Sequence, residues 1–200
     1  TDDIETLAAT RAGIIVGTKI ELRNVFDGDP GDPFDPALTR KVMRFDVDAD
    51  AIDRSRVPRD IAPQEPDGTP TVFRDWVFAR NGGQWTINDK TFDEDRVDAV
   101  IEHDTTEVWS LINKGGGWIH PIHPHLIEFK ILDRNGKPPE PYEIGFKDVV
   151  ALGPNDVVRI IFTVDEENSG LYVFHCHNLE HEDHDMMTQI EFTPRAGSGT

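Results

Sequence analysis

The sequence has little cysteine, little basic charge and no long apolar run. It contains one cysteine in 200 residues, so no disulfide can form within the chain and a disulfide scaffold is excluded. Its 20 Lys and Arg stand against 38 Asp and Glu, which gives a formal net charge of -18. This charge argues against nucleic acid as a partner, because phosphate binding needs a basic surface. No apolar run approaches the roughly 20 residues of a membrane helix, so we expect no membrane span.

Histidine is absent from the first 102 residues and crowded in two short stretches further on. Seven of the eight histidines lie in HPIHPH at 120–125 and HCHNLEHEDHDMM at 175–187. The second stretch also holds the only cysteine and two of the three methionines. The eighth histidine, His103, stands alone in VIEHDTTE, and we interpret it as structural or exposed. Imidazole, thiol and thioether gathered in this way predict a metal site rather than ordinary packing.

Short runs with strand character recur along the chain, with turn residues between them. They lie at 14–26, 41–49, 71–79, 84–88, 105–113, 123–132, 156–164, 170–177 and 187–192. Many short strands at this spacing predict an all-β sandwich or barrel. No long amphipathic helix is evident, and residues 3–13 are expected to form a brief helix at most.

Proline content and strand count predict the domain boundaries. Residues 50–70 contain four prolines and few apolar side chains, which indicates an interdomain linker. Residues 1–49 hold too few strands to bury a core alone, so we expect them to be the end of a preceding domain. Residues 71–200 hold the other strands and both histidine stretches, and are expected to form a domain of their own.

The second stretch can serve two metal sites at once. On a strand, successive side chains point to opposite faces, so Cys176 points one way while His175 and His177 both point the other. A loop or a single turn after the strand can bring His181 and Met186 back to the sulfur. Thiolate, imidazole and a weak thioether are the ligands of a blue-copper electron-transfer site.

The first stretch can supply the second histidine that a blue-copper site needs. His123 and His125 are two residues apart and share a strand face, whereas His120 lies three residues earlier and can turn elsewhere. We therefore assign His120 to the sulfur site and expect His123, His125, His175 and His177 to form a separate imidazole cluster suited to copper. Zinc is the main rival metal, but zinc fingers usually pair cysteines at short spacing and this chain has no second cysteine.

The two stretches together resemble the C-terminal copper-binding signatures of the multicopper oxidases, in particular the three-domain group of bilirubin oxidase, the spore-coat laccase and phenoxazinone synthase. INDKTFDEDRVDAVIEHDTTEVWSLIN is similar to the opening of the third domain in that family, and residues 142–160 are similar to the segment between the signatures. KVMRFDV followed by RVP looks like the end of the second domain. The resemblance implies a cupredoxin-like Greek-key β-sandwich or barrel at 71–200, preceded at 1–49 by the terminal strands of another cupredoxin domain.

The resemblance also implies a role for each ligand. The type 1 copper would be held by His120, Cys176, His181 and Met186, with Met186 axial and Met187 left to core packing. His123 would bind the type 2 copper, and the type 3 pair would be bound by His125, His175 and His177. In the family the residue matching Cys176 also conducts electrons to the flanking histidines. Glu182 matches an acid thought to help protonate reduced oxygen, and its other interpretation is a solvated charge in an acidic run.

The trinuclear cluster of the family needs eight histidines, of which this chain offers four. The resemblance therefore implies a partner, the N-terminal portion of the same enzyme as a cleaved chain or a separate subunit, which supplies four further ligands. The complete enzyme would bind four coppers, oxidise a phenolic, aminophenolic or bilirubin-like donor, and reduce dioxygen to water. The resemblance also implies that the enzyme is exported to the periplasm, the medium or a spore or cell surface.

One residue departs from the family pattern. Pro124 stands where the family has an aliphatic residue between the last two histidines of the first stretch. Proline removes a strand donor and is tolerated mainly at edges or bulges, so it can tilt His123 or His125.

Three other functions remain open. An electron-transfer cupredoxin would use only the type 1 ligands and gives no reason for the other four histidines. A non-catalytic cupredoxin scaffold is expected to have lost ligands, and here each expected one is present. Copper nitrite reductase shares a Cys–His type 1 site but lacks the His-Cys-His arrangement. One copper per assembled particle would favour the electron carrier, and four would favour the oxidase.

Overall fold

The computed structural model describes residues 16–24, 40–49, 68–164 and 169–195. The chain divides into two compact units, Thr1–Pro63 and Gln64–Thr200. The brief helix expected at 3–13 and most of the linker expected at 50–70 lie outside the described residues. Within the described ranges, no helix is both long enough and apolar enough to cross a membrane.

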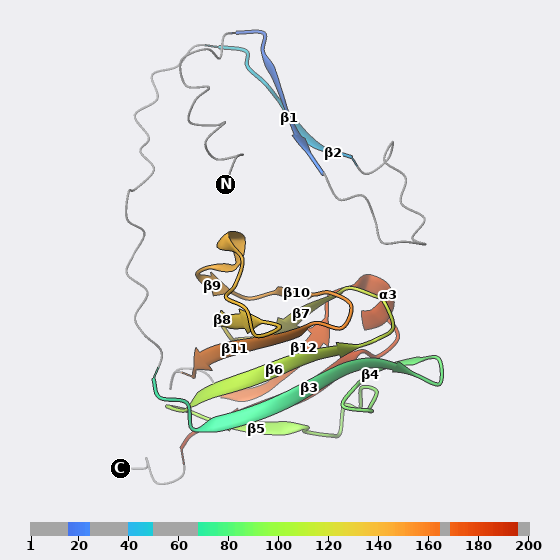
Figure 1. Cartoon of the computed structure of the whole chain (residues 1–200), viewed down its shortest axis with the longest axis vertical. Coiled ribbons are helices and arrows are strands. Elements are labelled where there is room, and N and C mark those ends of the chain that lie inside the picture. The colour runs from blue at the N-terminus through green and yellow to red at the C-terminus, as the bar shows by residue number, and fades with distance from the viewer. Residues whose placement is uncertain (1–15, 25–39, 50–67, 165–168, 196–200) are drawn as a thin grey trace. The chain divides into compact units, whose positions relative to one another are not determined.

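The described residues of the first unit form an antiparallel hairpin of β1 (Lys19–Arg23) and β2 (Lys41–Asp46) (Figure 1). Four of its five large apolar side chains, Leu22, Val42, Met43 and Phe45, are each more than half exposed in this chain. A lone hairpin is only marginally stable in water. The hairpin therefore offers apolar surface on which further strands can pack. The assignment of residues 1–49 to a preceding domain stays a prediction.

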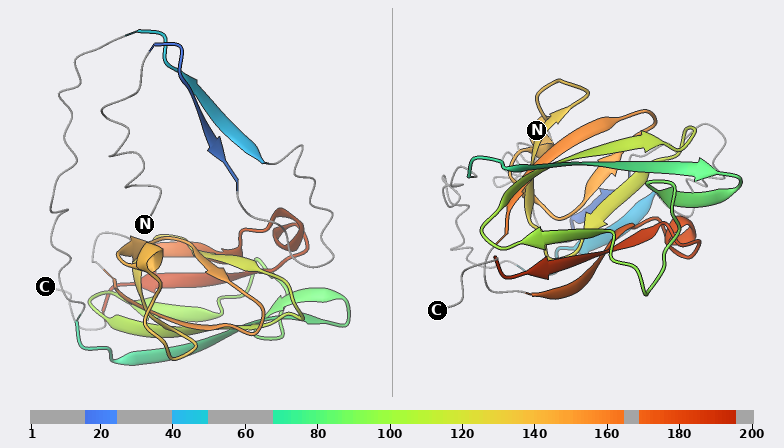
Figure 2. Two further views of the ribbon diagram at one scale, coloured as in Figure 1. Left: turned by 45° about the horizontal axis from the view of Figure 1, so that its top comes forward. Right: turned by 90° about the horizontal axis from the view of Figure 1, so that it is seen from below.

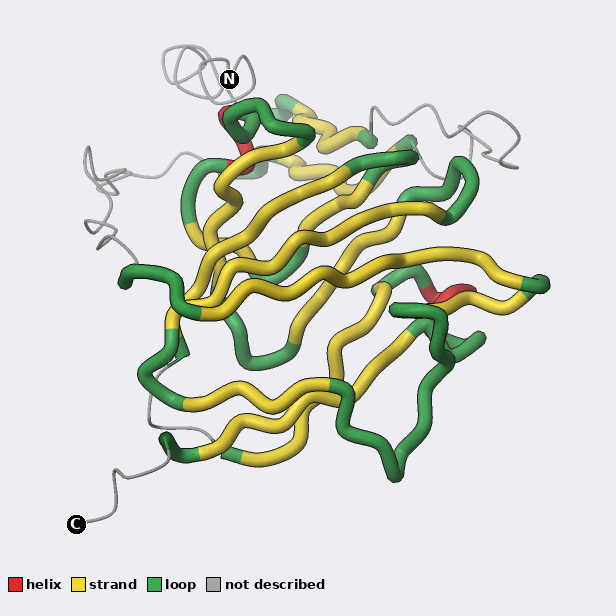
Figure 3. Tube along the Cα trace, turned by 60° about the horizontal axis from the view of Figure 1, so that its bottom comes forward, coloured by secondary structure: helices red, strands yellow, loops and turns green. Residues whose placement is uncertain are grey.

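The second unit is a sandwich of two mixed sheets. The five-stranded sheet has the order β10 (Val150–Leu152), β7 (His120–Pro124), β12 (Gly170–Cys176), β13 (Met187–Thr193) and β5 (Ala99–Glu102). The six-stranded sheet has the order β4 (Gln84–Ile87), β3 (Val72–Asn81), β6 (Thr106–Lys114), β11 (Val157–Thr163), β8 (Phe129–Arg134) and β9 (Phe146–Lys147). The described helices are a 3₁₀ turn, η2 (Pro141–Glu143), and the short α3 (Leu179–Glu182). The sheets curl around a common interior (Figure 2), and long strands run side by side in the sandwich (Figure 3). The predicted all-β sandwich is confirmed.

An aromatic cluster fills the core beneath the second histidine stretch. Trp76 and Trp109 lie with ring centroids 5.3 Å apart, and Phe174 is 5.1 Å from the first and 5.3 Å from the second. All three side chains are buried. Because Phe174 lies on β12 two residues before Cys176, this cluster anchors the strand that carries the thiol.

Two strand predictions need correction. The run 123–132 is predicted as one strand, whereas the chain turns between β7 and β8, and Leu126 there has a φ of 72°. The strands β5, β9 and β10, which are four, two and three residues long, were not predicted. Runs this short show too little alternation to be recognised, and pairing with neighbouring strands is what makes them extended.

The loop between β4 and β5 is fixed to the start of β13 by the carboxylate of Asp98. Its side chain is 6% exposed, and it accepts hydrogen bonds from Lys90 (2.6 Å), Arg96 (2.9 Å) and Thr188 (2.6 Å). Burial alone would raise the pKa of Asp98, but the bonds from Arg96, Lys90 and Thr188 outweigh burial and hold that pKa below its usual range. The loop is thereby held near Met186, which precedes β13.

Candidate metal centre

The second histidine stretch folds as the end of β12, the helix α3 and the start of β13. The side chain of Asn178 caps α3 by accepting a hydrogen bond from the backbone N–H of Glu180 at 3.1 Å. The N–H of Met186 donates to the carbonyl of His181, and the N–H of Cys176 donates to the carbonyl of Met186, both at 3.0 Å. These bonds close the loop and bring Cys176 and Met186, ten positions apart in sequence, next to each other.

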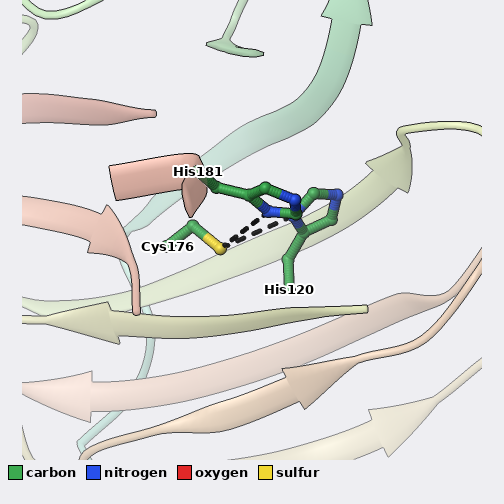
Figure 4. A group of neighbouring side chains, drawn as sticks. All are labelled: His120, Cys176 and His181. Carbon is green, nitrogen blue, oxygen red and sulfur yellow. Dashed lines mark hydrogen bonds between the residues drawn. The ribbon is translucent and has the colours of Figure 1, made fainter. Parts of the chain in front are cut away.

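His120, Cys176 and His181 converge from β7, β12 and α3 on one point (Figure 4). The sulfur lies 3.5 Å from Nδ1 of each histidine, and the two Nδ1 atoms are 3.0 Å apart. The three side chains are at most 1% exposed, and Met186 is fully buried. Three ligand atoms at these separations suit one metal ion bound at about 2.0–2.3 Å from each. We call these three residues the closed group.

Burial decides the protonation of the closed group. Burial, and then the neighbouring His181, lowers the pKa of His120 to about 3. Burial, followed by the charges of Arg80 and His184, lowers the pKa of His181 to about 4. Burial raises the pKa of the Cys176 thiol to about 12. At neutral pH the group therefore holds two neutral imidazoles and a neutral thiol, and a metal ion must displace the thiol proton on binding.

The polypeptide fits tightly around these imidazoles. Within the described residues, Nε2 of His120 and Nε2 of His181 are buried and make no hydrogen bond, at a cost of about 1–3 kcal/mol each. A Cβ added at Gly115 would lie 2.6 Å from Nε2 of His120, so the absence of a side chain there makes room for the ring. The fold thus holds both Nδ1 atoms toward the sulfur despite this cost. Two imidazoles and a thiol, followed in the same loop by the buried Met186, fit copper.

An aromatic wall covers the closed group. The ring of Trp85 on β4 lies 3.8 Å from that of His181, and Trp118 meets the same imidazole edge-on at 5.6 Å. On the neighbouring strand, Arg80 places its guanidinium carbon 5.0 Å from the Trp85 ring centroid. The sequence analysis missed Arg80 and Trp85, because β3 and β4 are far from both histidine stretches in sequence. The available signal was the Gly82–Gly83 turn, which pairs the two residues across a hairpin.

A second group of histidines lies on the other face of β7 and β12. His175 pairs with His123 in the strand register, and Nε2 of His175 lies 3.1 Å from Nε2 of His125. Nδ1 of His123 lies 2.7 Å from the carbonyl oxygen of Asp148. Because a carbonyl only accepts, that Nδ1 carries the proton and Nε2 is left as a ligand atom. His177 adds a ring 5.2 Å from that of His175, with a side chain 58% exposed. We call these four histidines the open group.

Glu182 lies beside the open group, as the last residue of α3. One of its carboxylate oxygens is 3.4 Å from Nδ1 of His175 and 3.8 Å from Nδ1 of His177. Its side chain is 30% exposed. A carboxylate this close to two imidazoles can hold them in orientation or exchange a proton beside them.

Pro124 occupies a place where a missing N–H is tolerated. It is the last residue of β7 and faces Phe174 of β12, while β10 pairs only with the three residues before His123. The rings of His123 and His125 on either side lie 4.8 Å apart. The proline therefore does not separate the two imidazoles.

The remaining candidates lie outside both groups. His103 is buried, in agreement with a structural role, and Ser169 lies within hydrogen-bond distance of its ring at 3.3 Å. His184 is exposed, and its Nδ1 donates to the carbonyl of Glu180 at 2.6 Å. Met187 is half-buried and lies opposite His175 in the sheet.

The sequence and the fold were compared with known proteins. Residues 64–196 match the family described as multicopper oxidase. The bilirubin oxidase of Albifimbria verrucaria is 44% identical over 191 residues, which cover 88% of this chain and 33% of that protein. The laccase of Bacillus subtilis is 39% identical over 144 residues, which cover 63% of this chain and 26% of that protein. The crystal structure of a multi-copper oxidase from Pediococcus acidilactici superimposes with a TM-score of 0.71 and 28% identity, covering 92% of this chain and 37% of the other.

The similarity to multicopper oxidases agrees with the two histidine groups on β7 and β12. The chain spans about a third of the length of the relatives it matches. The structural likeness confirms the cupredoxin-like sandwich predicted from the sequence, and the family match implies copper as the metal. Because that match covers well over half of the chain, this protein belongs to the multicopper oxidase family.

Proposed function

We propose that this chain is the C-terminal part of a laccase-like oxidase that couples oxidation of a small aromatic donor to reduction of dioxygen to water. The observation that carries the proposal is the pair of ligand groups on opposite faces of β7 and β12, joined through the peptide of His175, Cys176 and His177. An electron-transfer cupredoxin would need the closed group alone. The open group, with its imidazole nitrogens at 3.1 Å, has no purpose in such a carrier.

We assign the ligands as the sequence analysis does. The type 1 copper is held by His120, Cys176, His181 and Met186, the type 2 copper by His123, and the type 3 pair by His125, His175 and His177. Copper at these positions supplies the one-electron redox chemistry that protein side chains lack. The strand β12 supplies the connection, because alternation directs the sulfur of Cys176 to one face and the neighbouring imidazoles to the other.

The other side chains orient ligands and carry protons. The carbonyl of Asp148 fixes the tautomer of His123, as partners of metal-binding histidines commonly do. Glu182 would hold a proton beside His175 and His177 during oxygen reduction, and its short distances to both rings support this role.

The open group needs further ligands from outside this chain. The complete enzyme is proposed to bind four coppers, with four histidines supplied by an N-terminal portion that is either a cleaved chain or a separate subunit. The length of the relatives supports this, because the chain spans about a third of them. We accordingly interpret residues 1–49 as the end of a second cupredoxin domain, 50–70 as a linker, and 71–200 as the third domain.

The donor is proposed to be a phenolic, aminophenolic or bilirubin-like compound. Relatives of this chain are named bilirubin oxidase and laccase. Trp85 and Trp118 supply aromatic surface beside His181, and stacking of an aromatic donor against such surface is favourable. The net charge of -18 favours neutral or cationic donors only weakly, since salt screens it.

Metal analysis of the complete particle tests the proposed function. We expect four coppers per particle, a blue absorption band, and His-x-His pairs in the portion that supplies the missing ligands. A single copper per particle would instead support the electron carrier. Sequencing of every copurifying chain gives the second readout, since a partner without two His-x-His motifs would contradict the assignment of the open group.

A further inference from the structure

A positively charged side chain sits on the outer side of the aromatic wall. Arg80 on β3 and Trp85 on β4 are direct partners across the hairpin. The guanidinium carbon lies 5.0 Å from the indole centroid, which is the geometry of a cation–π contact. Arg80 is exposed, whereas Trp85 is only 6% exposed. The indole therefore lies between a solvated cation and the interior.

The inner side of the same indole faces both histidines of the closed group. Its ring lies 3.8 Å from that of His181 at an interplanar angle of 35°, and 5.5 Å from that of His120, nearly edge-on. Arg80 and two of the assigned type 1 ligands thus pack against the same aromatic ring. Few waters can screen the charge along this path, because Trp85 and both histidines are buried.

Arg80 contacts the indole of Trp85 as an exposed side chain. Within the described part of the chain, no ion pair joins Arg80 to a carboxylate. Arginine stays charged at all physiological pH values, and its flat guanidinium stacks on aromatic faces. The contact therefore places a permanent positive charge against the wall, in a protein whose net charge is -18.

We propose that Arg80 is a positioning residue that, through Trp85, makes the type 1 site a stronger electron acceptor. A fixed cation repels a doubly charged metal ion more than a singly charged one, so it favours the reduced site over the oxidised site. Its stacking also holds the indole against His181, which keeps water away from the ligand. This inference rests on the proposed function, since it requires copper in the closed group.

The test is an anaerobic redox equilibrium of the complete copper-loaded protein with ferrocyanide and ferricyanide. Each ferrocyanide gives one electron to one oxidised type 1 site and becomes ferricyanide, and the loss of blue absorption measures the reduced site. We expect Arg80→Gln to lower the ratio of reduced to oxidised site about fivefold. Arg80→Lys keeps the charge and should retain most of the ratio. Because the readout is an equilibrium, changes in how the anions approach Arg80 do not affect it.

A matched control removes an equal charge elsewhere. Lys137 lies in the turn after β8, is exposed, and pairs through its backbone with Arg134. Lys137→Gln should leave the ratio unchanged. The inference is overturned if Arg80→Gln shifts the ratio no more than Lys137→Gln, or if Arg80→Lys lowers it as much as Arg80→Gln. If the unaltered protein lacks a blue band when loaded with copper, the proposed function fails, and this inference fails with it.

Discussion

The closed group and the open group are built from the same two strands, yet they differ in what completes them. In the closed group the chain supplies every contact: the rings and the sulfur are buried, glycine leaves room behind one ring, and tryptophan covers another. In the open group His175 is buried, whereas His177 is 58% exposed. Two neighbouring β-strands can thus carry a buried group of side chains on one face and a partly exposed group on the other. Side-chain alternation along each strand keeps the two groups apart.

Removing one ligand from each group should separate their roles most clearly. Cys176→Ser should abolish the blue band and lower donor oxidation by a factor of about 100 or more, since the sulfur supplies both the band and the connection between groups. His125→Ala should lower oxygen reduction as severely while the blue band remains. Copper content, absorption and oxygen uptake measure these outcomes.

The matched control for these variants is His184→Ala, in the same stretch but exposed and outside both groups. It should keep the copper and the turnover. Loss of the blue band in His125→Ala would show that the two groups are not independent.

Glu182→Gln should show whether the carboxylate beside the open group takes part in proton transfer. We expect turnover to fall by a factor of about 100, which is typical when a general acid or base is lost, with the blue band and copper content unchanged. The pH profile of turnover should change with it. Asp183→Asn alters an exposed neighbour and should have little effect, so equal losses in both variants would argue for a solvated charge at Glu182.

Gly115→Ala should damage the closed group and leave the open group intact. The new Cβ meets the ring of His120 at 2.6 Å, so the ring must shift, at a cost of about 1–3 kcal/mol in type 1 copper affinity. Copper retention during dialysis against a chelator, with the blue band as reporter, measures the loss.

Gly117→Ala provides the contrast for that substitution. Gly117 has a φ of +109° and open space around its Cβ, so the change strains the backbone without touching a ligand. It should lower the melting temperature but keep the blue spectrum, and an identical spectrum in Gly115→Ala would contradict the proposed fit.

The smallest expected effect concerns Asp98, which fixes the loop near Met186. The folded-state pKa of Asp98 is depressed, so its stabilisation is present above the ordinary carboxyl pKa and is lost as the pH falls below it. Asp98→Asn should therefore cost about 1–2 kcal/mol of unfolding free energy near neutral pH and progressively less in acid. Thermal unfolding from pH 7 to pH 3 measures this, with the exposed Asp95→Asn as control. A difference that does not shrink in acid would contradict the ionic origin of the effect.

The faces of the ligands were predictable from the sequence, but their surroundings were not. Spacing alone separates Cys176 from its flanking histidines and His120 from His123, because each strand alternates strictly. The aromatic wall could not be found in this way, since Trp85 approaches His181 only through the pairing of distant strands. The turn at Leu126 was missed because its positive φ sits on an apolar residue that gives no turn signal. The ligand roles themselves stay predictions until copper is measured.

The burial of Cys176 also affects how readily its thiol reacts in the metal-free protein. Only the thiolate reacts readily with oxidants and alkylating agents, and burial raises the pKa of Cys176 to about 12. The single cysteine is therefore less reactive than an exposed cysteine, because its side chain is fully buried and its thiol stays protonated at neutral pH. A metal ion bound at the closed group would turn this protected sulfur into a ligand by displacing one proton.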